Sequence, residues 1–181
     1  MEKGLYKYTA QEALNTHLGN VITVTPTIST STVEYSPGDA LISNVEIPNA
    51  VPFPGGTSVL MQVGFWNRTP DTAGLAEHVM LFHQKSGADL GPVNQATDID
   101  ASEFSNLGFL GAVRLETSAQ ETSMDNVTFG MFQDFFFSKY FLLQAEPDST
   151  SVYFSIDLTG NPILSGGGND LTWIFHIEYK R

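Results

Sequence analysis

The chain contains no cysteine among its 181 residues. Disulfide bonds, metal sites with thiolate ligands and a cysteine nucleophile are therefore excluded together. A domain of this length buries about 70% of the surface that its unfolded chain exposes, so its core needs no cross-link. The sequence predicts one globular domain held together by apolar packing.

Basic residues are scarce as well: 8 Lys and Arg stand against 20 Asp and Glu, a net charge of −12. Nucleic-acid binding requires a basic patch, so we expect no DNA or RNA partner. Half of the basic residues lie at the two ends of the chain, namely Lys3, Lys7, Lys180 and Arg181. The body of the protein should therefore present an acidic surface, which favours solubility.

Long hydrophobic runs are also missing. No stretch approaches the roughly 20 apolar residues that cross a bilayer, so we expect no membrane partner. The opening residues "MEKGLYKY" lead into no apolar segment of the kind found in a secretory signal. These features predict a soluble protein that is made in a cytoplasm.

What the sequence does contain is an alternation with a period of two. β-Branched and aromatic residues alternate with polar ones from Val21 to Tyr179, in about eight segments separated by turns rich in Gly, Pro and Asn. This pattern predicts an all-β fold, an antiparallel β-sandwich, with a jelly roll as the expected arrangement. We assign residues 21–181 to this domain.

The stretch "EIPNAVPFPGG" (46–56) predicts a corner between two strands. Its prolines cannot continue a ladder of hydrogen bonds, and Gly55-Gly56 can adopt the positive φ of a sharp reversal. After the corner, alternation places four side chains on one face, Val59, Met61, Val63 and Phe65, with Trp66 on the other. In the strand at 109–116, Phe109, Val113 and Leu115 are expected to point inward.

Two segments have helical signals. Thr9 and Glu12 have the spacing of a capping box, and Leu14 and Leu18 follow at helical spacing. The 1–20 arm is thus expected to contain a short helix, which either packs on its own domain or reaches a neighbouring subunit. Residues 98–108 predict a second, shorter helix as an insert between strands, ended by Gly108.

No residues have the spacing of a catalytic or metal site. His78 and His83 lie five apart on one expected strand and so point to opposite faces, which disfavours a shared metal ion. Asp98, Asp100 and Glu103 lack the spacing of an EF-hand loop. The sequence also has no nucleophile elbow and no phosphate-binding glycine loop before a helix. We expect no enzymatic activity, no metal and no cofactor.

The segment "MFQDFFFSKYFLL" (131–143) is unusual because its aromatic residues do not alternate cleanly. One interpretation is a strand that is buried on both faces. The other is an aromatic patch, formed by Phe135, Phe136, Phe137 and Tyr140, that covers another subunit. Trp66 is a second candidate for such a patch.

Four stretches together resemble a family of tailed-phage virion structural proteins: "PGDALISNVEIPNAV", "PGGTSVLMQVGFWN", "LFHQKSGADLGPVNQATDIDASEFSNLGFLGAV" and "DSTSVYFSIDLTGNP…LTWIFHIEY". The resemblance covers roughly residues 35–179 and rests on the order of strands and turns. It implies a jelly roll or a related β-sandwich on the particle surface. The 1–20 arm and the phenylalanine-rich 131–143 segment depart from the family pattern.

The resemblance implies a capsid decoration (cement) protein that binds across joints between subunits of the major capsid protein, or another virion protein. Such a protein would be made in the host cytoplasm and located on the capsid surface as a homo-oligomer, for which a trimer is one expected form. The candidate interface residues are Lys3, Lys7, Leu14, Leu18, Trp66, Phe135, Phe136, Phe137 and Tyr140.

Two other functions are compatible with a β-sandwich. A carbohydrate-binding or receptor-binding appendage would need coplanar exposed aromatic rings, for which Trp66, Tyr153 and Trp173 are the candidates. A cupin-type enzyme would need clustered histidines, which the spacing of His78 and His83 disfavours.

Overall fold

The computed structural model describes residues 20–28, 30–31, 33–68, 78–87, 91–98, 101–115, 121–124, 127–132, 141–159 and 171–179. Ten strands and one helix lie in these residues. The strands are β1 (Asn20–Val24), β2 (Ala40–Ile47), β3 (Thr57–Asn67), β4 (His78–His83), β5 (Phe109–Leu115), β6 (Glu121–Met124), β7 (Val127–Phe132), β8 (Phe141–Gln144), β9 (Val152–Leu158) and β10 (Leu171–Tyr179). The helix α2 comprises Ala101–Leu107. The helix expected in the 1–20 arm lies outside the described residues, apart from Asn20, which begins β1.

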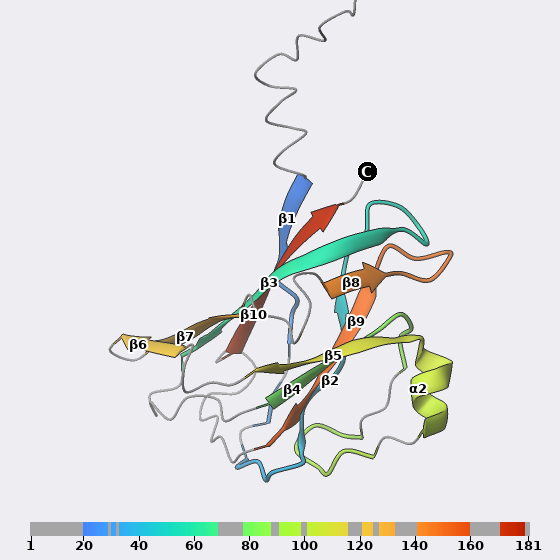
Figure 1. Ribbon diagram of the computed structural model, residues 1–181. Coiled ribbons are helices and arrows are strands. Elements are labelled where there is room, and N and C mark those ends of the chain that lie inside the picture. Colours follow the sequence, from blue (N-terminus) through green and yellow to red (C-terminus); the bar gives the residue numbers. More distant parts are fainter. Residues whose placement is uncertain are drawn as a thin grey trace, which may run out of the picture.

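The strands form two antiparallel sheets (Figure 1). In the part of the chain that the structure describes, the larger sheet has the order β1-β10-β3-β7-β6, and β8 also pairs with β3. The smaller sheet has the order β2-β9-β4-β5. The two sheets pack against each other, so the prediction of an all-β antiparallel sandwich is confirmed.

The core lies between the inner faces of the two sheets and is rich in aromatic rings. Phe175 of β10, in the larger sheet, lies 4.9 Å from Phe154 of β9 and 6.2 Å from Phe82 of β4, measured between ring centroids. All three side chains are fully buried. Edge-to-face contacts of this kind hold the sheets together and exclude water from the space between them.

The predicted corner before β3 is confirmed. Gly55 has a φ of +71°, and a Cβ atom at Gly56 would lie 2.8 Å from the carbonyl oxygen of Phe53. Both positions therefore require glycine, for different reasons: the first because of its dihedral angle, the second because of the close backbone.

Alternation along β3 differs from the prediction. A β-bulge at the pairing of β10 with β3 leaves Met61 without an opposite residue, since Ile177 pairs with Leu60 and His176 with Gln62. The bulge shifts the alternation by one, so Leu60 is fully buried and Met61 is 38% exposed. The prediction was correct for Val63, Phe65 and Trp66, which follow the bulge. It was wrong for Val59 and Met61, which lie on the opposite face from Val63 and Phe65 because of the bulge.

The predicted helical insert is confirmed as α2, which lies in the connection between β4 and β5 (Figure 1). Gly108 ends it with a φ of +62°. The backbone N–H groups of Gln84 and Lys85 donate to the carbonyl oxygen of Leu107, so the last turn is tied to the end of β4. Phe109 is 41% exposed and does not point inward. A bulge next to the pairing of His83 with Phe109 shifts the alternation of β5, so Phe109 lies on the outward side and packs on Phe104 of α2.

Two isoleucines on β10 test this assignment of faces. Ile177 is fully buried in the core, whereas Ile174 lies on the opposite face and is half-buried. We expect Ile177→Ala to lower the free energy of unfolding by about 2–5 kcal/mol, because it leaves a cavity in the core. Ile174→Ala, the matched control, should cost about 1 kcal/mol or less. Denaturant unfolding followed by circular dichroism measures both, and equal losses would contradict the assignment.

Candidate interaction surface

The outward side of the larger sheet is formed by rows of side chains that cross its strands. One row runs from Val21 through Glu178 and Val59 to Leu142. The next joins Thr23, His176 and Gln62, and the third joins Ile174 and Gly64. The last pairs Thr172 with Trp66. We call the side chains in these rows, together with Met61 and Arg68, the outer face.

The outer face displays more apolar area than the solvent side of an antiparallel sheet needs. Leu142 is 56% exposed, Val21 54%, Trp66 45% and Met61 38%. The solvent side of such a sheet is usually polar, whereas grouped exposed apolar side chains mark a surface that contacts another molecule. The outer face is therefore the best candidate for an interaction surface in the described residues.

Trp66 is held in position by its neighbour Arg68. The guanidinium carbon of Arg68 lies 5.6 Å from the centroid of the indole ring, a cation–π contact. The Nη1 atom of the same guanidinium donates a hydrogen bond to Oγ1 of Thr172 at 3.2 Å. An exposed aromatic ring that is already oriented loses little conformational entropy when a partner covers it.

The other end of the outer face is apolar with one carboxylate. Val59 is nearly fully buried between Glu178 on one side and Leu142 on the other. Glu178 lies six residues along β10 from Thr172, which places it about 20 Å from the Arg68 end at 3.3 Å per residue. The outer face thus has a cation at one end and an anion at the other.

Met61 occupies the place where β3 changes its neighbour. Residues 57–60 of β3 pair with β8, and residues 63–67 pair with β7. The bulged residue lies between these two pairings, so its side chain is turned to the outer face. The segment that joins β7 to β8 includes Phe135, Phe136, Phe137 and Tyr140, and these candidates lie outside the described residues.

Of the predicted interface residues, Trp66 alone falls in the described part of the chain, and it is exposed on the face opposite Val63 and Phe65, as expected. Lys3, Lys7, Leu14 and Leu18 lie outside it. Sequence reasoning missed Val21, Arg68 and Leu142. The alternation in "FLL" (141–143) could have indicated Leu142, since Leu143 is buried and Leu142 therefore points outward.

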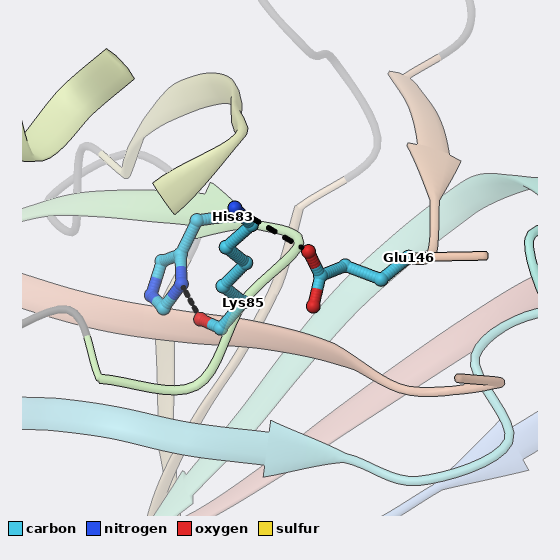
Figure 2. Close-up of polar contacts among 3 residues, drawn as sticks. All are labelled: His83, Lys85 and Glu146. Carbon is cyan, nitrogen blue, oxygen red and sulfur yellow. Dashed lines mark hydrogen bonds and ion pairs between the residues drawn. The ribbon is translucent and has the colours of Figure 1, made fainter. Parts of the chain in front are cut away.

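A second polar group lies at the outward side of the smaller sheet, around His83. Its Nδ1 atom donates to the backbone oxygen of Lys85 at 2.8 Å, and Lys85 Nζ forms an ion pair with Glu146 Oε1 at 3.5 Å (Figure 2). The Nε2 atom lies 3.5 Å from Oγ of Ser155, and the backbone N–H of Asn44 donates to that hydroxyl oxygen at 2.8 Å. The imidazole also stacks on Tyr153.

A serine and a histidine can act as a nucleophile and its general base, but the surroundings of Ser155 and His83 do not suit that role. Ser155 is fully buried and His83 is 3% exposed, so no substrate carbonyl can reach the hydroxyl oxygen. The group instead ties β4 to β9 and to β2. Burial lowers the pKa of His83 below its usual value, because a charged imidazolium is poorly solvated there.

The described residues contain no group of three or more His, Asp or Glu side chains that could hold a metal ion. His78 and His83 point to opposite sides of β4, as predicted: His78 lies in the core against Phe65 and Trp173.

No helix in the described ranges is long and apolar enough to cross a membrane. Trp173 is fully buried, so it was wrong as a candidate for an exposed carbohydrate-binding ring.

Comparisons with protein-family models and with curated proteins found no match to this chain.

The lowered pKa of His83 predicts a pH dependence of stability. Below pH 6.5 the unfolded chain binds a proton at this imidazole before the folded chain does, so the free energy of unfolding should fall as the pH drops from 7.5 towards 5.5. Denaturant midpoints across this range measure the slope. His83→Gln, which does not titrate, should flatten it, and equal slopes in both proteins would contradict this role of His83.

Proposed function

We propose that this chain is a structural component of a tailed-phage virion, namely a capsid decoration (cement) protein that binds across joints between subunits of the major capsid protein. The observation that carries the proposal is the outer face. A rigid sandwich with an exposed apolar sheet is suited to binding proteins, and burying that area on a shell would stabilise it in proportion to the number of copies bound.

The order of the strands supports a jelly roll, a fold that occurs in viral capsid domains as well as in lectins and cupins. The pairings are nested: β1 pairs with β10, β2 with β9, and β3 with β7 and β8. The innermost pair is β4 with β5. Such nesting arises when one long hairpin is rolled up so that its strands divide between two sheets.

The distribution of charge suggests how the protein would be oriented on a shell. The net charge is −12, yet Lys3, Lys7, Lys180 and Arg181 lie at the ends of the chain. We propose that the 1–20 arm binds the capsid through Lys3, Lys7, Leu14 and Leu18, and that the acidic body remains outside. The acidic surface would keep unbound copies apart, and the arm would bind the shell together with the outer face.

A truncated chain tests this proposal. Because β1 begins at Asn20, removal of residues 1–19 leaves every described strand complete. We expect the truncated protein to fold but to lose co-sedimentation with empty shells assembled from the major capsid protein. Circular dichroism checks the fold, and Lys3→Glu combined with Lys7→Glu should weaken binding in the full-length chain.

The control is Lys85→Glu, which reverses a cation in the β4–β5 connection instead of one in the arm. It should reduce the affinity for shells far less than the same change at Lys3 and Lys7. Undiminished binding by the truncated protein would refute the role of the arm. Failure of the full-length protein to bind shells at all would refute the decoration function.

A receptor-binding appendage is the second candidate, because Trp66 is exposed and oriented by Arg68. An indole ring of this kind can stack on a sugar ring. Binding to a glycan array that is lost in Trp66→Ala, with no binding to shells, would favour this function over the first.

A further inference from the structure

We propose that, in the free protein, residues 1–19 of the arm fold back over the outer face of their own chain, with Leu14 and Leu18 against its exposed apolar side chains. This inference goes beyond the proposed function, because it concerns the protein in solution and holds whether or not a shell is bound. It rests on two apolar surfaces, one in the arm and one on the larger sheet, that the chain joins at Asn20.

The exposed apolar side chains at one end of the outer face are spaced to receive one helix. Val21 and Leu142 end a row that crosses β1, β10, β3 and β8, so their backbone positions lie about 14 Å apart. Met61 is exposed on β3, between the two. An α-helix with its side chains is about 10–12 Å across. A helix that lies along β10 and β3 therefore covers Met61 and can contact Val21 and Leu142 on its two sides.

The point at which the arm joins the sheet gives its direction. β1 starts at Asn20 and runs from the row of Val21 towards the end of the outer face that carries Trp66. Gly19 precedes β1, and a glycine after the last helical residue commonly adopts the left-handed conformation that turns the chain. A reversal there directs the arm back along the outer face, antiparallel to β1.

The length of the arm matches the length of the outer face. From the row of Glu178 to the row of Thr172 the face is about 20 Å long at 3.3 Å per residue. A helix over residues 9–18 is about 15 Å long at 1.5 Å per residue. Residues 1–8 then reach the end of the face at which Trp66 lies, so the arm is long enough to cover all the exposed apolar side chains.

The predicted helix of the arm needs such a contact in order to form. A helix of about ten residues is marginal in water, and most helical stability in proteins comes from the packing of an apolar side. Leu14 and Leu18 lie one turn apart on the same side of the predicted helix. The outer face is the exposed apolar surface of the described residues to which this helix is directly tethered.

The tether also decides between the chain's own arm and the arm of a second copy. The outer face, about 14 Å by 20 Å between backbone positions, is smaller than the roughly 800 Å² per partner of a stable interface between separate molecules. A segment on a short linker has an effective concentration in the millimolar range, so a weak contact suffices within one chain. The arm would thereby shield the outer face of unbound copies, and a shell would have to displace it before both surfaces bind.

The absence of cysteine from the natural chain allows a cross-linking test. In the full chain carrying Leu14→Cys and Met61→Cys, we expect mild oxidation to form a disulfide bond within one chain, seen as a monomer on a non-reducing gel. The matched control is Thr16→Cys with Met61→Cys, which has nearly the same tether but lies on the opposite side of the predicted helix. Its disulfide should form at least about tenfold more slowly, because the sulfur atom is turned away from β3.

Tryptophan fluorescence measures the cover independently. Trp173 is fully buried, so a change in acrylamide quenching reports on Trp66, the other tryptophan of the chain. Removal of residues 1–19 should raise the quenching constant about twofold or more, because the cover is lost. Leu14→Gln with Leu18→Gln should have the same effect in the full chain.

The control for this measurement is Asn15→Gln with Thr16→Gln, which introduces the same residue on the other side of the predicted helix. It should leave the quenching constant unchanged, since glutamine is a good helix former and these positions do not face the sheet. Circular dichroism of every variant verifies that the strands remain folded.

Three results would overturn the proposal. Equal rates of disulfide formation for Leu14→Cys and Thr16→Cys would mean that the arm is not a packed helix, and disulfide-linked dimers would mean that a second copy supplies the cover. Quenching that does not change on removal of residues 1–19 would mean that the arm leaves Trp66 open. Shell binding is measured separately: the expected cross-link without shell binding would refute only the decoration function, and shell binding with equal rates would refute only this inference.

Discussion

The packing of Phe175 against Phe154 and Phe82 is the contact on which the rest of the structure depends. These rings come from strands of different sheets, and each strand alternates, so turning them inward turns the neighbouring residues outward. The outer face is therefore a consequence of the core: Leu171, Trp173, Phe175 and Ile177 cannot be buried without presenting Thr172, Ile174, His176 and Glu178 on the other side. The properties of the surface follow from the register of the core.

The bulge at Met61 interrupts the strict alternation between core and outer face at one place in β3. It allows Leu60 to fill the core beside Ile177 while β3 passes from one neighbouring strand to another. The residue left over cannot point inward without displacing core side chains, so an apolar methionine is added to the outer face. A similar bulge near His83 turns Phe109 away from the core and onto α2. Both irregularities increase the apolar area that the sandwich exposes.

The polar contacts of His83 and those of Arg68 have different roles because the burial of the two residues differs. His83 and Ser155 are buried and join three strands of the smaller sheet, so their hydrogen bonds contribute to the fold. The pair of Arg68 and Trp66 is open to solvent and joins residues that are already neighbours across β3 and β10. Such a pair contributes little to stability, and its value lies in holding an aromatic ring ready for a partner.

Composition and alternation alone determined the all-β class, the corner at Gly55-Gly56, the helix that ends at Gly108 and the outward direction of Trp66. Each of these depends on residues close together in the chain, for which local geometry and the period of two suffice. The tertiary structure decided which side chains form the outer face. Val21, Glu178 and Leu142 are distant in sequence, as are Arg68 and Thr172, and each set is brought together only by strand pairing. The tertiary structure also decided where the alternation shifts. A bulge arises from a mismatch between two paired strands, so the sequence of one strand alone does not show its position.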